Sequence, residues 1–238
     1  MKTFSIFFLI FLISSTDSAL HSMMQKLKNS SKFSAKKDTL VIIGNLLLQT
    51  YEPAFVAGVL ANINAEGTIG KFESSNYVSH PEAKPQYLKY MDSLYDYRNK
   101  YSGRIVINVS LLELNKLLQK LKADNWQKGK FGLGCVQWTG GRTYNLVQTY
   151  NDECGNCDRI TLDQATSAEG KMIIKELQGS HASTYNTWKN ENSNKNTASA
   201  AYSAGYWVCK KYEIPADTET KAKQRGNTAI EIYNIMTN

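Results

Sequence analysis

The sequence is poor in several residues that mark particular classes of protein. Its 238 residues include only four prolines, four cysteines and three histidines. Since 42% of the residues are hydrophobic, the chain can form a folded core and is neither disordered nor fibrous. It also lacks any apolar run long enough to cross a bilayer, so it is not a multi-span membrane protein. The length suits one domain of about 150–200 residues with short extensions.

The most apolar run lies at the N-terminus and is typical of an export signal. Lys2 gives a positive start, residues 4–13 are largely apolar, and small and polar residues follow. We therefore expect residues 1–19 to be a signal peptide that is removed, and the mature protein to be secreted to an extracellular destination. Residues 20–37 are polar and basic, and we expect them to be a mobile lead-in to a domain over residues 38–238.

Four cysteines follow this segment, and an oxidising destination would allow them to form up to two disulfides, with three pairings open. We expect Cys154 and Cys157 to close a local loop, and Cys135 and Cys209 to form a long-range staple. A redox pair or half of a zinc site is less favoured, because the sequence has no second CxxC and no histidine near the first. We expect neither a metal nor a cofactor.

The formal charge of +7 favours an anionic partner. Nucleic acid is disfavoured, because the lysines are spread along the chain and no nucleic-acid-binding module is recognisable. An anionic bacterial cell wall fits a secreted basic protein better. We expect a monomer that has no membrane contact once the signal is removed.

Hydrophobic periodicity predicts a mainly α-helical domain with a little strand, which is an α+β fold. Leucine and isoleucine recur at helical spacing after Asp38, and either Asp38 or Thr39 could cap that helix. A second helix opens with Pro53 and ends at Glu66, before a glycine. Periodicity is lost over residues 67–107, which suits a small hairpin and a long loop. Further helices are expected over residues 110–121, 141–150, 162–178, 183–190, 197–212 and 218–236.

Glu66 is the first candidate for chemistry, because it stands where an apolar helix meets a glycine. A carboxyl that is half-buried against apolar neighbours holds its proton more tightly, as a general acid must. A glutamate at the end of a helix is also commonly a solvated surface charge. Position alone therefore does not decide between these two roles.

The second candidate is the segment from Phe131 to Arg142, which sets an amide, an indole, a hydroxyl and a guanidinium among glycines. Gln137, Trp138 and Thr139 would suit a carbohydrate, since aromatic faces stack on sugar rings and polar groups hydrogen bond to sugar hydroxyls. A turn with a buried tryptophan is the alternative. The segment does not suit a phosphate loop, because no Lys-Ser or Lys-Thr pair follows its last glycine.

Three segments together resemble the phage tail-type lysozyme family, which is related to goose-type lysozymes and lytic transglycosylases. Residues 55–67 resemble its helix-plus-glutamate motif, and residues 132–142 are similar to its GLGxxQWTGxR motif. Residues 212–217, with Arg225 and Ala229, resemble its closing YExPAD…R…A pattern. The three segments occur in the family's order and span most of the chain. The resemblance implies a lysozyme-like α+β fold with a small β-hairpin or long loop beside the cleft.

In function, the resemblance implies a muramidase that cleaves the β-1,4 bond between N-acetylmuramic acid and N-acetylglucosamine in bacterial peptidoglycan. Glu66 would protonate the leaving glycosidic oxygen, and Gln137, Trp138 and Thr139 would line the glycan groove. Tyr202 lies in an AYSAG segment that resembles the AYNAG of lytic transglycosylases, whose tyrosine contacts the catalytic glutamate.

Several alternatives stay open. A lytic transglycosylase would use the same single glutamate and leave a 1,6-anhydro sugar, and a secreted wall-binding protein would keep the groove without turnover. A cysteine hydrolase would pair Cys135 with His181 or His80, which a disulfide at Cys135 would exclude. A second carboxylate for hydrolysis is not identified by any motif. The candidates by position are Glu73, Asp92 and Asp96.

Overall fold

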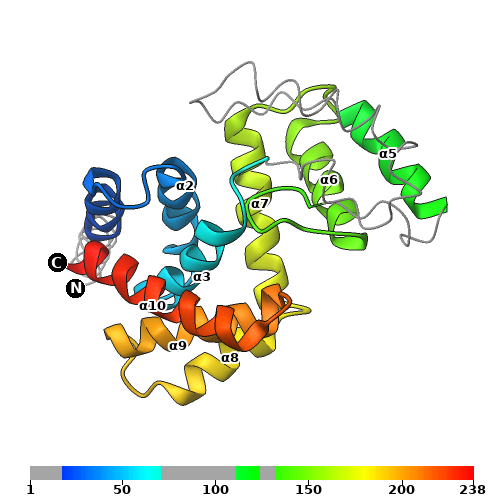
Figure 1. Cartoon of the computed structure of the whole chain (residues 1–238). Helices are drawn as coiled ribbons and strands as arrows, with labels where there is room; N and C mark the ends of the chain where they lie inside the picture. The colour runs from blue at the N-terminus through cyan, green and yellow to red at the C-terminus, as the bar shows by residue number, and fades with distance from the viewer. Residues whose placement is uncertain (1–17, 71–110, 124–131) are drawn as a thin grey trace, which may run out of the picture. The chain divides into compact units, whose positions relative to one another are not determined.

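The computed structural model describes residues 18–70, 111–123 and 132–238 (Figure 1). These residues are mostly helical, and the one extended pairing among them is an isolated antiparallel bridge between Leu133 and Trp138. The predicted mainly helical fold is therefore confirmed. The predicted hairpin falls almost wholly on residues outside the described part of the chain and stays a prediction.

The chain divides into two compact units, which are described separately. Unit 1 comprises the residues up to Asn62 and those from His181 onward, and unit 2 comprises Ile63–Ser180. After a helix over residues 18–29, the helical elements in chain order are α2 (Lys37–Leu47), α3 (Pro53–Glu66), α5 (Leu111–Ala123), α6 (Gly141–Cys154), α7 (Leu162–Gln178), α8 (Ala182–Glu191), α9 (Ala198–Val208), the π-helical turn η2 (Cys209–Glu213) and α10 (Thr218–Thr237). The division between the units falls within α3.

Unit 1 is held together by apolar helix packing. The part of α3 that lies in this unit is apolar on all sides and is buried, as expected of a central helix. Phe55 of α3 packs against Trp188 of α8, with ring centroids 5.1 Å apart. α9 lies along α10, and its residues Ala201 and Ala204 are completely buried. Asn62 of α3 adds a polar contact, because its Nδ2 donates to the Gly205 carbonyl at 3.1 Å.

The N-terminal basic segment is more ordered than predicted. Residues 18–29 form a helix, and Met24 and Leu27 on it are buried in unit 1. Two apolar residues three positions apart share one face of a helix, so this segment has a face that can pack. The expectation of a mobile lead-in over residues 20–37 is therefore wrong. The apolar part of the predicted signal, residues 4–13, lies outside the described residues.

The helix bounds agree with the periodicity, with three differences. α2 begins after Lys36 with no side-chain cap, so the predicted caps at Asp38 and Thr39 are wrong, and Asp38 lies in the first turn instead. α6 continues beyond Tyr150 to Cys154. The helix predicted over residues 197–212 is two elements, α9 and then η2. α3 begins and ends as predicted.

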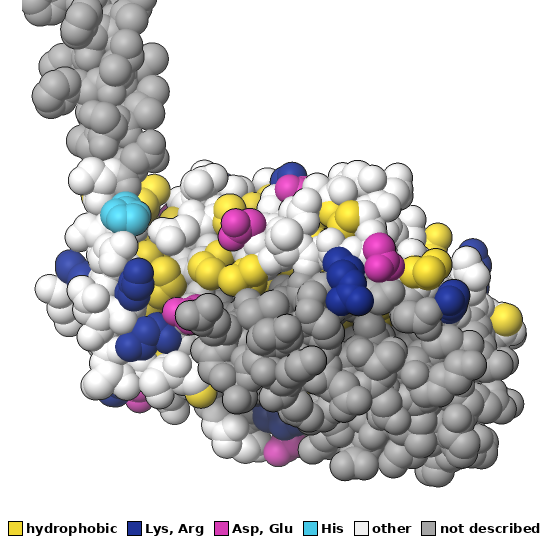
Figure 2. All heavy atoms as spheres, turned by 90° about the horizontal axis from the view of Figure 1, so that it is seen from above, with side chains coloured by type: hydrophobic (Ala, Val, Ile, Leu, Met, Phe, Trp, Pro, Cys, Tyr) yellow, Lys and Arg dark blue, Asp and Glu magenta, His cyan; other side chains and the backbone are white. Residues whose placement is uncertain are grey.

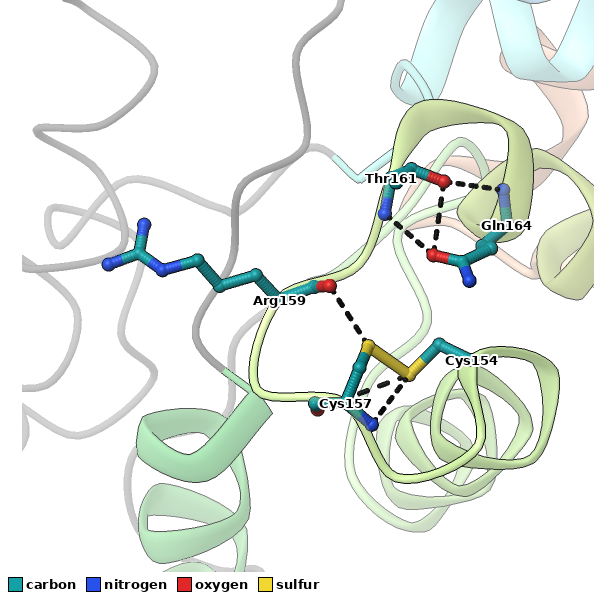
Figure 3. Close-up of a disulfide and its surroundings, with 5 residues drawn as sticks. All are labelled: Cys154, Cys157, Arg159, Thr161 and Gln164. Carbon is teal, nitrogen blue, oxygen red and sulfur yellow. Dashed lines mark hydrogen bonds between the residues drawn. A yellow bond between two sulfur atoms is a disulfide. The ribbon is translucent and has the colours of Figure 1, made fainter.

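Unit 2 contains α5, α6, α7 and a glycine-rich segment, residues 132–140. α6 packs against both α5 and α7. A disulfide between Cys154 and Cys157 closes the turn that leaves α6, as predicted (Figure 3). Close by, α7 begins with a capping box, in which the Thr161 hydroxyl accepts from the Gln164 amide and the Gln164 side chain accepts from the Thr161 amide. The disulfide and the capping box together fix the connection from α6 to α7.

The predicted long-range staple does not form. Cys135 lies in unit 2 and Cys209 in unit 1, both are buried thiols, and no disulfide joins them. The Cys135 thiol instead hydrogen bonds to the carboxylate of Glu169. An even number of cysteines predicts how many pairs can form, but it does not place two thiols within bonding distance.

The surface shown in Figure 2 carries mixed charge. Lysine, arginine, aspartate and glutamate side chains are interspersed over the described part of this face. No helix in the described part of the chain combines the length and the apolar character that a membrane span requires. Within the same residues there is no cluster of three or more His, Cys, Asp or Glu side chains that could hold a metal ion.

Candidate active site

Glu66 is the last residue of α3, and its side chain is half-buried. The helical hydrogen bonding continues one residue further, because the amide of Gly67 donates to the Ile63 carbonyl at 3.1 Å. Residues 67–70, called the turn after Glu66, then follow the helix, with turn geometry at residues 69 and 70. The carboxyl is thus carried at the end of a regular helix rather than on a long loop.

The turn after Glu66 lies directly against the glycine-rich segment. A β-carbon on Gly67 would lie 2.5 Å from the Gly134 carbonyl oxygen, and 3.0 Å from both the Cys135 carbonyl oxygen and Gln137 Nε2. No side chain fits at these distances, so only glycine lets the two backbones approach this closely. The structure therefore brings together two of the segments that sequence analysis singled out.

The glycine-rich segment forms a tight turn with Gln137 near its tip. The amides of Leu133 and Trp138 donate to each other's carbonyls at 3.0 and 2.9 Å and close the turn. Gln137 is half-buried with a left-handed φ of 52°, and its Nε2 donates to the Gly134 carbonyl at 2.7 Å. Thr139 is exposed. Of the predicted sugar-binding residues in this segment, Gln137 and Thr139 remain accessible to a ligand.

Trp138, in contrast, is completely buried. Its indole Nε1 donates to Glu176 Oε2 at 3.0 Å. An aromatic residue that stacks on a sugar needs an exposed ring face, so the expected role of Trp138 in lining a groove is wrong. The alternative left open from the sequence, a turn with a buried tryptophan, describes this residue.

Glu176 of α7 also fixes the end of the segment through Arg142. Arg142 Nε donates to Glu176 Oε1, and its terminal Nη2 donates to Oε2, both at 2.9 Å. The Glu176 side chain is only 11% exposed, so this two-point ion pair is largely shielded from water. The tryptophan and the arginine of the GLGxxQWTGxR motif thus bind the same carboxylate, and both hold the glycine-rich segment in its conformation.

A second carboxylate of α7, Glu169, is completely buried. Its Oε1 accepts from the Gly70 amide and from the Tyr150 hydroxyl, both at 2.6 Å, and its Oε2 accepts from the Cys135 amide at 2.7 Å. Burial raises the pKa of Glu169, and the hydrogen bonds from Tyr150, Gly70 and Cys135 act in the opposite direction. One buried carboxylate thus joins α6, the turn after Glu66 and the glycine-rich segment.

Comparison with known proteins identifies the family. The model of a family described as phage tail lysozyme matches residues 37–236, which is most of the chain. The chain belongs to the phage tail lysozyme family. Among curated proteins and among solved structures, no significant match is found. The resemblance drawn from the three sequence motifs is therefore confirmed, and the family indicates a peptidoglycan-lytic enzyme of the glycosidase type.

Neither glutamate of α7 was among the residues predicted from the sequence. Glu169 and Glu176 are seven residues apart, so they lie on the same face of the helix. The signal that could have found them is their place in the apolar stripe of α7. That stripe consists of Ala165, Ala168, Met172, Ile173 and Leu177. A carboxylate on such a stripe is seldom buried without partners, so its position predicts buried hydrogen-bond donors.

Tyr202, the remaining predicted site residue, lies in unit 1 on α9 and is half-buried. Its ring packs against α10, where a β-carbon on Gly226 would lie 2.7 Å from the ring atoms Cδ2 and Cε2. The ring also stacks with Tyr206, with centroids 6.5 Å apart. Its predicted contact with Glu66, which belongs to unit 2, stays a prediction. The carboxylate candidates Glu73, Asp92 and Asp96 lie outside the described residues.

The structure does not favour a cysteine hydrolase. Cys135 has no exposed surface, whereas a catalytic thiol must be reached by its substrate. His181 lies in unit 1, where its Nδ1 is 3.2 Å from the Lys211 carbonyl oxygen and its ring meets Tyr212 edge-on. His80 lies outside the described residues. Burial of the thiol therefore argues against this alternative, although the disulfide that was expected to exclude it is not formed.

Proposed function

We propose that this protein is a secreted muramidase that hydrolyses the β-1,4 bond between N-acetylmuramic acid and N-acetylglucosamine in peptidoglycan, with Glu66 as the general acid. The observation that supports the proposal best is the close approach of the turn after Glu66 to the segment that carries Gln137. A half-buried carboxyl at a helix end thereby has an amide from a second segment nearby. Family membership supplies the class of reaction and of substrate.

The chemistry assigned to Glu66 is delivery of a proton to the leaving glycosidic oxygen while positive charge develops at C1 of the sugar. Partial burial suits this role, because it limits the access of bulk water to the reacting groups. Gln137 and Thr139 offer an amide and a hydroxyl for hydrogen bonds to the acetamido and hydroxyl groups of the glycan. Tyr202 is a further candidate for substrate binding from unit 1.

Hydrolysis also requires that a water molecule attack C1, with a base or a nucleophile from a second carboxylate in most glycosidases. Glu169 and Glu176 are poor candidates, because one is completely buried and the other is bound to Arg142 and Trp138. Glu73, Asp92 and Asp96 therefore stay the candidates. A lytic transglycosylase would dispense with this group, since the substrate's own 6-hydroxyl closes onto C1.

The expected destination follows from the apolar N-terminal segment, which would direct the chain out of the cell. The formal charge of +7 would then favour approach to an anionic bacterial wall. We propose that the mature protein acts there as a monomer, without a metal or a cofactor.

Mass spectrometry of purified peptidoglycan after digestion tests the proposal. A muramidase leaves hydrated N-acetylmuramic acid at the new ends. Products that carry 1,6-anhydro ends would instead show a lytic transglycosylase. If the protein sediments with the wall material but releases no fragments, it is a wall-binding protein and the proposal is overturned.

A further inference from the structure

The buried carboxylate of Glu169 is a group for which the proposed reaction has no chemical use. It has no exposed surface, so it cannot contact a glycan in this structure. It nevertheless accepts hydrogen bonds from three separate parts of unit 2. Gly70 belongs to the turn after Glu66, Cys135 to the glycine-rich segment and Tyr150 to α6.

The bonds from Gly70 and Cys135 end on different oxygens of the same carboxylate. Gly70 donates to Oε1 at 2.6 Å and Cys135 donates to Oε2 at 2.7 Å. The carboxylate therefore spans the two backbone segments and holds them next to each other. These segments are also the ones that meet where Gly67 lies against the Gly134 carbonyl.

The amides of Gly70 and Cys135 donate to the Glu169 side chain and not to a backbone carbonyl of a regular element. Both amides are donors that need a buried acceptor, and an unsatisfied buried N–H is costly. Tyr150 in turn fixes the carboxylate from α6, since its hydroxyl donates to Oε1 at 2.6 Å. Gly134 also lies against the carboxyl group, because a β-carbon there would come within 3.1 Å of Glu169 Cδ.

We propose that Glu169 is a positioning residue for Glu66, which fixes the turn after Glu66 against the segment that carries Gln137. The effect on catalysis rests on the proposed function, because it requires Glu66 to be the general acid. The role of Glu169 in fixing the turn does not depend on that function. A displacement of about 1 Å at a catalytic group can cost about 100-fold in rate, so a holder of this turn affects turnover without touching the substrate.

Amide hydrogen exchange on Glu169→Gln tests the structural part directly. An amide side chain has one oxygen and one nitrogen, so it cannot accept from both Gly70 and Cys135. Exchange should become about tenfold faster at one or both of these amides, as loss of a buried hydrogen bond implies. The amides of Leu133 and Trp138 serve as the internal control, because they pair with each other in the same segment. Their exchange should not change.

Steady-state kinetics on soluble peptidoglycan fragments test the catalytic part. Glu169→Gln should lower kcat by about 10–100-fold and leave KM within about twofold, because the residue does not touch the substrate. Leu146→Ala is the matched control, since it opens a cavity in α6 of the same unit and removes none of the hydrogen bonds to Glu169. It should destabilise the protein but keep kcat. Tyr150→Phe removes one bond only and should lower kcat less, in the same direction.

Hydrogen exchange and steady-state kinetics together distinguish failure of the positioning role from failure of the proposed function. Equal exchange rates at Gly70 and Cys135 in wild type and in a folded Glu169→Gln would overturn the proposal, as would a kcat no lower than that of Leu146→Ala. If Glu169→Gln does not fold, a Tyr150→Phe protein with unchanged exchange at both amides overturns it. If the wild type releases no glycan ends while the exchange effect appears, the proposed function fails and the positioning role of Glu169 in the turn stands.

Discussion

Among the described residues, each unit buries one tryptophan completely, and the two differ in what their indole N–H groups bind. Trp188 of unit 1 donates to the backbone carbonyl of Ala200 at 2.7 Å and packs against Phe55. Trp138 of unit 2 donates at 3.0 Å to the carboxylate of Glu176, which also binds Arg142. The first tryptophan is part of helix packing, and the second is part of a hydrogen-bonded loop.

The difference extends from the tryptophans to their units. Both of the buried glutamates in the described part of the chain, Glu169 and Glu176, lie in unit 2. Unit 1 consists mostly of helices, whose backbone groups bond internally. The glycine-rich segment and the turn after Glu66 leave amides that need partners elsewhere. Apolar packing is therefore enough to assemble the helices, whereas a site built from turns requires buried acceptors.

Removal of the two tryptophans separates these roles. Trp188→Ala and Trp138→Ala should each lower the free energy of unfolding by about 3–5 kcal/mol, because each opens a large cavity. Only Trp138→Ala should also lower kcat, since Trp138 adjoins Gln137. Urea unfolding and kcat, measured at a temperature where both variants are folded, check this. An equal loss of kcat in both variants would contradict the contrast between the units.

Glycine substitutions test the close approach beside Glu66. Gly67→Ala should lower the free energy of unfolding by about 1–3 kcal/mol and reduce turnover, because its β-carbon meets the Gly134 carbonyl. Gly141→Ala is the matched control, since a β-carbon there has no neighbour within 4 Å. It should be neutral or stabilise by up to about 1 kcal/mol. Thermal unfolding and reducing-end assays compare the two, and normal turnover in Gly67→Ala would argue against a fixed turn.

The disulfide should contribute modestly and only to stability. Replacement of Cys154 and Cys157 by serine should lower the free energy of unfolding by about 2 kcal/mol, as expected for closure of so short a loop. Because the capping box at Thr161 still fixes the start of α7, kcat should stay the same. Chemical unfolding without reductant measures the first effect. A large loss of activity would mean that the turn between α6 and α7 influences the site.

The smallest expected effect is on the pH dependence of the free energy of unfolding. Burial raises the pKa of Glu169 above its ordinary value of 4.5, so the folded protein binds this proton more tightly than the unfolded chain does. The contribution of Glu169 to the free energy of unfolding should therefore fall as the pH rises from about 4.5 through the raised pKa. Unfolding of wild type and of Glu169→Gln across this range should show the decline in wild type only. A parallel pair of curves would assign the decline to other groups.

Much of the helical architecture was predictable because it depends on local pattern. The apolar run from Pro53 to the glycine after Glu66 predicted both the bounds of α3 and the place of its terminal carboxyl. The N-terminal helix was missed because Met24 and Leu27 give only a short apolar face in a basic segment.

The candidate site was predictable in its segments but not in the role of each side chain. An indole among glycines is compatible with an exposed or a buried ring, and only the position of Glu176 decides for Trp138. The bonds of Glu169 join residues that are 19 to 99 positions away, so no local pattern contains them. For Cys135 and Cys209, the even number of cysteines allowed a second disulfide, but it could not show whether the two thiols lie within bonding distance.

Release of reducing ends from purified peptidoglycan by wild type and by Glu66→Gln tests the central claim most directly. The exchange of a carboxyl for an amide keeps the size of the side chain, so the unfolding temperature and the co-sedimentation with wall material should be unchanged. We expect release to fall at least about 100-fold, as loss of a general acid implies. A Glu66→Gln protein that is folded, binds the wall and still cleaves at the wild-type rate would contradict the role of Glu66.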